Sequence, residues 1–135
     1  MPSPAWSLQQ AMFAALSADV ALTALLGAGR IYDDVPQATS PPYVVLGPIT
    51  ARDWSTSTED GAEHVITLHV WSRMRGKKQA HEIMSAVSAA LHDQSLTLAG
   101  HRLVNLRHET SDVRRDPDGE TIHGTLRFRA VTEPA

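Results

Sequence analysis

Histidine is the residue type in this chain with the widest chemical scope, because a neutral imidazole can accept a proton near neutral pH or bind a transition metal. Seven positions carry it: His64, His69, His81, His92, His101, His108 and His123. The pair His81-Glu82 begins like the helical zinc motif of metalloproteases, but Ser85 stands where the second imidazole is needed. We therefore expect scattered surface and half-buried histidines, and the sequence predicts neither a metal site nor a cofactor.

Other catalytic patterns are also missing from the sequence. The glycines of segment 27–29 follow a predicted helix rather than a strand, so they indicate a helix stop and not a phosphate loop. The acids of segment 116–120 lack the 12-residue ligand pattern of a calcium loop. There is no Gly-x-Ser-x-Gly elbow, and the absence of cysteine removes thiolate nucleophiles and thiolate zinc sites. The sequence predicts that the protein is not an enzyme.

One hypothesis of a different class stays open at this point. A small ligand-binding or enzymatic α+β domain could build a site from His69, His108 and neighbouring acids. Such a site requires that both imidazoles converge on one pocket.

The densest basic cluster consists of Arg73, Arg75 and Lys77 together with Lys78. It could contact a phosphate backbone, but a solvated turn and a contact with another protein are the other interpretations. The formal net charge is −3, so the chain has no basic excess of the kind that nucleic-acid-binding proteins carry. Nucleic acid is therefore not the favoured ligand.

Trp54 is the other unusual residue, since it stands beside Arg52 and Asp53 in a polar segment that also contains Glu59. An exposed tryptophan flanked by charges is typical of an interface anchor. The alternative is a loop tryptophan that folds back onto the core.

The elements that must position these residues follow from the hydrophobic period. Residues 64–73 alternate with period two, which predicts a strand, and after a short basic turn residues 80–91 repeat with period 3.6, which predicts an amphipathic helix. The apolar stripe of that helix consists of Ala80, Ile83, Met84, Val87 and Leu91. Burying each large side chain of such a stripe on a sheet is worth roughly 1.5–3 kcal/mol, so this pair is expected to form the centre of the core.

The N-terminal part is predicted to be helical. Ser7 and Gln10 have the spacing of a capping box, so a helix should begin at Ser7. Asp19 offers a second cap before a run that stops at Gly27, which predicts one bent helix or two short ones.

Most of the remaining strands are predicted to pair in an antiparallel sense. Residues 43–49 form an apolar strand that Gly47 and Pro48 should weaken or bulge, and residues 50–62 are predicted to be a long polar loop between two strands. Extended segments are also expected at 96–98, 103–110 and 121–132. The turn signal Asp-Pro-Asp-Gly at 116–119 joins the last two of these in a hairpin.

A hairpin centred near this turn would place Leu106, His108, Leu126 and Phe128 on one side. Its other side would carry Arg107, Glu109, Arg127 and Arg129, a polar ribbon with a cationic excess. The fold class expected is α+β, with a mainly antiparallel sheet of four to five strands and helices packed on one face.

Length and composition place these elements in one domain spanning residues 1–135, with 42% hydrophobic and 20% charged residues. Segments 1–6 and 133–135 are expected to be flexible tails. The N-terminus lacks the positive region of a signal peptide, and the longest apolar run is far shorter than the roughly 20 residues that cross a bilayer. We expect synthesis in the cytoplasm and no membrane contact.

Several segments together resemble the tail-terminator (tail-completion) proteins of long-tailed bacteriophages, and the resemblance is closest to the branch found in gene transfer agents. The segments that carry it are Leu25-Leu26-Gly27, Arg30-Ile31-Tyr32-Asp33, Pro36, Pro42-Tyr43-Val44-Val45-Leu46-Gly47, His69-Val70-Trp71-Ser72-Arg73, Leu98-Ala99-Gly100 and Gly124-Thr125-Leu126-Arg127-Phe128-Arg129. Their order and spacing cover the chain from about Ser7 to Thr132.

The resemblance implies a structural virion component without catalytic residues. Such a protein forms a ring, usually of six subunits, on the head-proximal end of the tail tube, where it stops tube polymerisation and joins the tail to the neck or stopper protein. It implies synthesis in a bacterial cytoplasm and a place at the tail-neck junction of a phage-like particle. A neck or head-completion ring, one layer closer to the head, is the alternative within the same particle.

Subunit and partner contacts are expected at the edges of the sheet and in segment 50–62, because edge strands carry unpaired backbone groups. We expect Arg107, Arg127 and Arg129 to face a neighbouring subunit or an acidic partner. DNA would pass through the ring without specific binding, since a net negative ring neutralises few phosphates. The full set of expected contact residues is Arg52, Asp53, Trp54, Glu59, Arg73, Arg75, Lys77, Arg107, Arg127 and Arg129.

Overall fold

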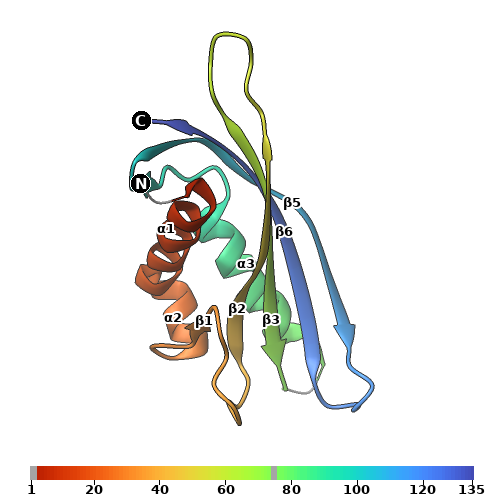
Figure 1. Cartoon of the computed structure of the whole chain (residues 1–135). Helices are drawn as coiled ribbons and strands as arrows, with labels where there is room; N and C mark the ends of the chain where they lie inside the picture. Colours follow the sequence, from red (N-terminus) through yellow and green to blue (C-terminus); the bar gives the residue numbers. More distant parts are fainter. Residues whose placement is uncertain (1–2, 74–75) are drawn as a thin grey trace.

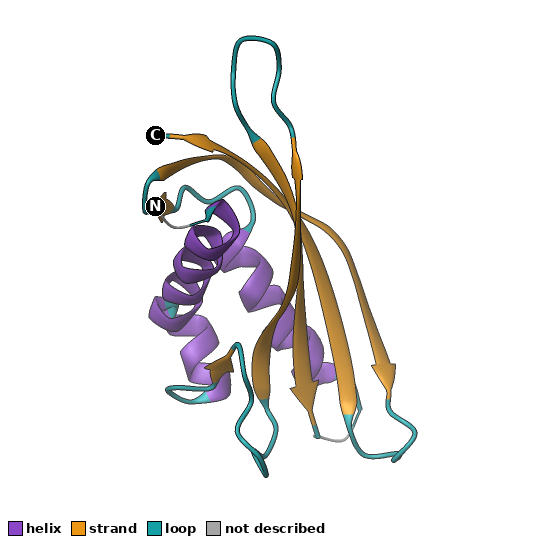
Figure 2. Ribbon diagram, in the orientation of Figure 1, coloured by secondary structure: helices purple, strands orange, loops and turns teal. Residues whose placement is uncertain are grey.

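Three helices cover one face of a single twisted sheet, and the other face of the sheet carries no helix (Figures 1 and 2). The structure is a computed structural model that describes residues 3–73 and 76–135, and its helices and strands are those of these two ranges. The elements are α1 (Pro4–Ala18), α2 (Val20–Leu26), β1 (Ile31–Tyr32), β2 (Tyr43–Asp53), β3 (Ala62–Ser72), α3 (Lys78–Leu91), β4 (Thr97–Leu98), β5 (His101–Arg115) and β6 (Ile122–Pro134). The α+β class with helices on one face is as predicted.

The sheet has more strands than the sequence indicated. Within the described residues it contains six strands in the order β1-β2-β3-β6-β5-β4, and β1 pairs with β2 in parallel. The prediction of four to five strands missed β1, which has two residues, too few to show a hydrophobic period, whereas β4 lies within the segment 96–98 that was expected to be extended. The four long strands pair with one another in an antiparallel sense, as expected.

The core lies between α3 and the covered face of the sheet. Ile83, Val87 and Leu91 of α3 are fully buried, as are Leu68 of β3 and Phe128 of β6. The buried residues of β3 and α3 belong to the two apolar faces that the sequence predicts, one with the period of a strand and one with the period of a helix. Strand, turn and helix are therefore arranged as the sequence predicts.

The N-terminal helix begins earlier than the capping box indicated. Ser3 is the N-cap, with its hydroxyl accepting from the Trp6 backbone N–H at 3.1 Å, and Pro4 occupies the first turn, where its missing N–H costs nothing. Ser7 is buried inside α1, and its hydroxyl donates to the Ala99 carbonyl at 2.9 Å. Residues 4–6, expected in a tail, are thus helical.

Asp19 divides the first helical run into two helices, as predicted. Its carboxylate accepts from the Leu22 backbone N–H at 2.8 Å and so caps α2, and the axes of α1 and α2 differ by 75°. No helix among the described residues has by itself the length and apolar character needed to cross a membrane, and only the bent pair α1 and α2 taken together meets that test.

The connection between β2 and β3 projects beyond the body of the sheet (Figure 1), and we call this end of the hairpin the arm (residues 49–66), in which β3 stays paired with β6 from Ala62 onward. The loop predicted at 50–62 is shorter than expected, because the pairing of β2 with β3 continues to Asp53 and Ala62 and leaves residues 54–61 as the connection. The register shifts between Leu46 and Ile49, so the bulge expected at Gly47 and Pro48 is present.

The hairpin of β5 and β6 closes at the predicted turn. Asp118 accepts hydrogen bonds from the backbone N–H groups of Glu120 and Thr121 and from the Thr121 hydroxyl. These bonds lower the pKa of Asp118 to about 2. Strand β6 continues to Pro134, so residues 133 and 134 are part of the sheet rather than of a tail.

Candidate functional site

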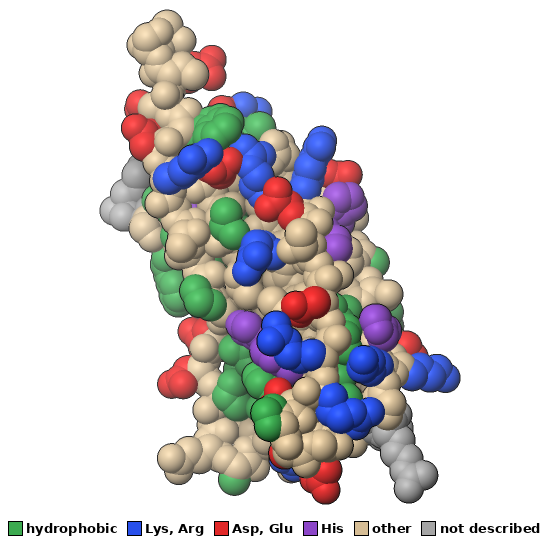
Figure 3. All heavy atoms as spheres, turned by 90° about the vertical axis from the view of Figure 1, so that its right-hand side faces the viewer, with side chains coloured by type: hydrophobic (Ala, Val, Ile, Leu, Met, Phe, Trp, Pro, Cys, Tyr) green, Lys and Arg blue, Asp and Glu red, His purple; other side chains and the backbone are tan. Residues whose placement is uncertain are grey.

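The side of the sheet without helices, which we call the open face, carries the residues that sequence analysis singled out for contact. On β3 it presents the alternating side chains Val65, Thr67, His69 and Trp71, and on β6 it presents His123, Thr125, Arg127 and Arg129. Figure 3 shows basic, acidic and histidine side chains gathered over this side of the molecule. Tryptophan and arginine are the residue types enriched in the centres of protein interfaces.

A buried carboxylate organises the upper part of the open face. Glu63 is 8% exposed, and its two oxygens each lie 2.5 Å from the Nε of an arginine, one from Arg52 and one from Arg129. Burial alone would raise the pKa of Glu63, but the hydrogen bonds and charges of Arg129 and Arg52 lower it below the usual value. The carboxylate therefore stays ionised and ties the arm to the central strand β6.

Trp54 lies against this ion pair rather than in the core. The guanidinium of Arg52 is 5.4 Å from the centre of the Trp54 ring and that of Arg129 is 5.0 Å away, both within cation–π range. The ring is 45% exposed. The alternative of a tryptophan folded back onto the core is thus wrong for this residue, and the exposed ring is fixed in place.

A second feature of the open face is a hollow of about 780 Å³, which we call the arginine hollow. It is lined by Arg107, His108, Glu109, Thr110, Arg127 and Arg129. Arg107 of β5 stands directly opposite Arg129 of β6, so the predicted arginine ribbon is confirmed, while Glu109 falls at a bulge between His108 and Thr110. Like charges placed opposite each other on a sheet are destabilising unless counter-charges lie near.

The lower part of the open face carries an aromatic stack. The rings of Trp71 and His123 are parallel within 3° and 4.0 Å apart, and His69 Nδ1 lies 2.8 Å from His123 Nε2. Burial lowers the pKa of both histidines below 6.5. Both rings are thus favoured in the neutral form, in which one nitrogen donates and the other accepts.

A pH effect on stability is expected from His64, which is fully buried with its Nε2 3.0 Å from the Thr132 hydroxyl. Burial, and then the charge of His101, lower its pKa in the folded state. The unfolded chain therefore binds more protons, and stability should fall as pH drops from about 6.5 through the folded pKa, by at most about 1.4 kcal/mol per pH unit for this group. Urea midpoints measured between pH 7.5 and 5 test this.

The control for that pH effect is a pair of substitutions. His64→Gln should flatten the fall in urea midpoint, whereas His81→Gln on the exposed side of α3 should leave its steepness unchanged. An equal pH dependence in wild type and His64→Gln would contradict the assignment.

The histidine site of the alternative hypothesis is not assembled. His69 points to the open face, whereas His108 points to the helices, where its ring meets Phe128 edge-on at 5.4 Å. The sheet separates the two imidazoles because residues of opposite parity point to opposite faces. Among residues 3–73 and 76–135 no three histidine, aspartate or glutamate side chains are grouped to hold a metal.

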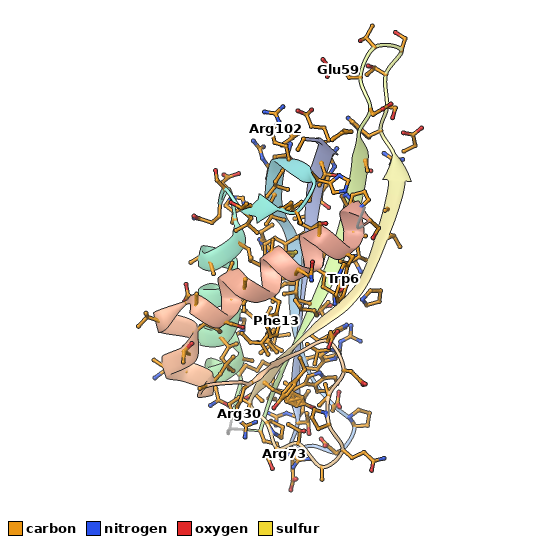
Figure 4. All side chains as sticks on the ribbon, turned by 60° about the vertical axis from the view of Figure 1, so that its left-hand side comes forward. Trp6, Phe13, Arg30, Glu59, Arg73 and Arg102 are labelled. Atoms are coloured by element: carbon orange, nitrogen blue, oxygen red, sulfur yellow. The ribbon has the colours of Figure 1, made fainter. Side chains whose placement is uncertain are left out.

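An apolar groove lies on the helical side of the molecule, between α1 and β2. Trp6, Phe13 and Leu46 line it together with Gln9, Gln10 and Asp33, and its volume is about 420 Å³. Trp6 is 48% exposed and Phe13 43% exposed, which is unusual for large apolar side chains. Figure 4 shows both beside α1 at the margin of the sheet.

Both margins of the sheet have backbone without a partner strand in the described residues. On one side β1 covers only Val44 and Val45 of β2, so the edge from Leu46 to Asp53 is free. On the other side β4 covers only His101 and Arg102 of β5, and residues 92 and 93 bond to the edge at Leu106 and His108, so the free part of this edge runs from Glu109 to Arg115. Free edges of this length are templates for pairing with another chain unless a neighbour covers them.

The basic turn lies at the end of the sheet opposite the arm (Figures 1 and 4). Arg73 is exposed with its Nε 3.4 Å from the Thr121 hydroxyl, and the exposed Lys77 precedes α3 without a side-chain cap. Arg75 lies outside the described residues. The nine expected contact residues that the structure describes therefore fall into an arm group, a hollow group and a turn group rather than one site.

Sequence analysis did not single out Glu63, Trp6 or Phe13. Glu63 stands just before the predicted strand 64–73, and only the pairing of β2, β3 and β6 brings two arginines to it. Trp6 and Phe13 are spaced i, i+7 on one side of a helix, which was a usable signal of an apolar stripe.

A sheet with helices on one face, two free edges, and an open face rich in tryptophan and arginine defines a protein shaped for contact with other protein surfaces. Residues 10–133 match the family described as Tail completion protein gp17, so the chain belongs to that family. It is a structural tail-completion protein and not an enzyme.

Similar proteins agree with this assignment. The chain is 31% identical over 88 residues to the tail completion protein gp17 of Bacillus phage SPP1, and the alignment spans 65% of the chain and 65% of that protein. A chain in the virion of a native gene transfer agent particle is 34% identical, with 98% of this chain and 99% of that one covered at a TM-score of 0.90. The structure of SPP1 gp17 shares the fold, at 24% identity and a TM-score of 0.63 over 93% and 88% of the two chains. The predicted resemblance to the gene transfer agent branch is confirmed.

Proposed function

We propose that the chain is a tail terminator, which forms a ring on the head-proximal end of a phage-like tail tube, stops tube polymerisation and joins the tail to the neck. The observation that carries this proposal is the likeness to a chain of the gene transfer agent virion over 98% of the sequence, at a TM-score of 0.90. Membership of the tail-completion family supports it.

The free sheet edges give the ring a physical basis. The free edge of β2 and the free edge of β5 lie on opposite sides of one sheet. When the β2 side of one copy meets the β5 side of the next, the contact is heterologous, and it closes into a ring if the rotation between copies divides a full turn. The apolar groove at Trp6 and Phe13 adds hydrophobic area beside the β2 edge.

The charge of such a ring suits a conduit for DNA. Each copy carries a formal charge of −3, so six copies would carry about six times that charge. Non-specific DNA affinity depends on neutralising phosphates, and a ring of net negative charge lets DNA pass without holding it.

Assembly with purified tube protein tests this function. We expect light scattering to give a particle of about six times the 14.7 kDa chain, formed alone or on the tube protein. Electron microscopy should show shorter tubes, capped at one end, as more of this chain is added. A strict monomer with and without tube protein, together with unchanged tube lengths, would refute the proposal.

The alternative position, a neck ring one layer closer to the head, is separated by imaging the intact particle. Density for this chain directly on the last tube ring supports the terminator, whereas density separated from the tube by another protein supports the neck ring.

A further inference from the structure

We propose that the arginine hollow of each copy receives the acidic tip of the arm of the next copy in the ring. The tip is residues 55–60, with Glu59 and Asp60 as its two acids. This inference rests on the proposed ring and names the two surfaces that meet at each seam.

The hollow has more positive charge than its own chain compensates. Glu63 neutralises Arg129 but is shared with Arg52. Arg107 reaches only Asp93, at 3.5 Å with both side chains mostly exposed, and exposed pairs of this kind contribute little. Glu109 also lines the hollow, and no ion pair involves Arg127 within residues 3–73 and 76–135. An acidic occupant would relieve the repulsion between the opposed arginines.

The tip presents acids without partners on a fixed loop. The Thr56 backbone N–H donates to the Glu59 carbonyl at 2.8 Å, and the Thr56 hydroxyl accepts from the Glu59 backbone N–H at 3.0 Å. The side chain of Ser55, and then its backbone N–H, which donates to the Asp53 carboxylate at 2.9 Å, lower the pKa of Asp53. The Glu59 and Asp60 side chains are exposed, and neither carboxylate has an ion pair within the described part of the chain.

Topology brings these two surfaces to one seam. The arm's β2 lies toward one margin of the sheet and the hollow's β5 toward the other, while β3 and β6 are neighbours at its centre. The arm extends away from the body, and Glu59 lies at its far end (Figures 1 and 4), so a tip does not reach the hollow of its own chain. A contact between the β2 side of one copy and the β5 side of the next places a tip of charge −2 beside a hollow of opposite sign.

A second copy is favoured over other occupants because each chain supplies one tip and one hollow in equal number, as a closed heterologous ring requires. DNA phosphates, or an acidic segment of another virion protein, are the competing occupants. Reversing the charge of the tip or of the hollow distinguishes these occupants from a second copy.

The experiment uses full-length variants reversed at exposed positions. The hollow variant is Arg107→Glu with Arg127→Glu, and the tip variant is Glu59→Arg with Asp60→Arg. We expect each variant alone to raise the concentration needed for assembly at least tenfold at about 0.1 M salt, where the Debye length is about 10 Å. Mixing the two variants in equal amounts should restore assembly, because alternating copies then meet opposite charges at every seam.

Matched controls are Arg114→Glu on the same face, where Arg114 already pairs with Asp112, and Glu120→Arg in the β5–β6 turn. Both should assemble as wild type does, and thermal melts should show all variants folded. Normal assembly of the hollow variant, with or without a loss of affinity for a DNA oligonucleotide, would overturn the contact while leaving the ring intact. Failure of the mixture to assemble would also overturn it, and a wild-type chain that never assembles would overturn the proposed function itself.

Discussion

Phe128→Ala is expected to lower the free energy of unfolding by about 3–5 kcal/mol, the usual cost of emptying a buried aromatic site. Phe128 is fully buried on β6, the strand that pairs with both β3 and β5 at the centre of the sheet. Its ring packs edge-on to His108 and faces the helices. Domains of this size are stable by about 5–15 kcal/mol, so a large part of the total is lost, and urea denaturation measures it.

A conservative change and a surface change bracket this effect. Phe128→Leu keeps most of the volume and should cost less than half as much. Val104→Ala, at a position that is 48% exposed, should change stability by about 0.5 kcal/mol or less. Equal losses for Phe128→Ala and Val104→Ala would show that Phe128 is not in the core.

Gly47→Ala is expected to destabilise the protein by about 1–3 kcal/mol, although it adds one methyl group. A Cβ at Gly47 would lie 2.6 Å from the Thr67 carbonyl oxygen and 3.0 Å from the His69 ring. The carbonyl is backbone of the central strand β3, so it cannot rotate away, and β2 itself must shift. The loss should appear as a lower urea midpoint.

Gly124→Ala is the matched control for this steric argument. A Cβ there would lie 2.5 Å from the sulfur of Met84, an unbranched side chain that can change rotamer. Its cost should therefore be smaller than that of Gly47→Ala. A larger loss of stability for Gly124→Ala than for Gly47→Ala would mean that β2 is free to move and that Met84 is not.

The sequence was sufficient to predict the elements in which a hydrophobic period or a clear cap or turn signal is present. The strand and helix of residues 64–91, the division at Asp19 and the turn at 116–119 are all found where the patterns place them. Hydrophobic burial enforces each of these, since a one-residue slip would expose the whole apolar face.

The local sequence pattern predicted the wrong element bounds where long-range contacts determine the structure. Two capping signals compete at the N-terminus, and Ser3 is the cap because the hydroxyl of Ser7 is satisfied by Ala99, 92 residues away. Residues 50–53 were predicted to be part of a loop because this end of β2 is exposed, and an alternating pattern exists only where one face is covered.

The sequence identified candidate contact residues by their type, but it did not show which of them lie close together in the fold. Charge and aromatic content singled out Arg52, Trp54 and Arg129 separately, and the strand register brings all three together around Glu63. The same register separated His69 from His108, which no spacing rule along the chain could show before the pairing of β3 with β6 was known.

The hydrogen bonds within the arm tip would affect how fast copies of this chain associate in the proposed ring. A loop that must order on binding slows the step after encounter and costs entropy for each residue that it immobilises. The bonds between Thr56 and Glu59 exist in the isolated chain, so in the proposed ring diffusion and orientation, rather than folding of the tip, would set the rate at which one copy joins another. Closure of such a ring would then keep pace with a growing tube, which is the timing that the proposed terminator requires.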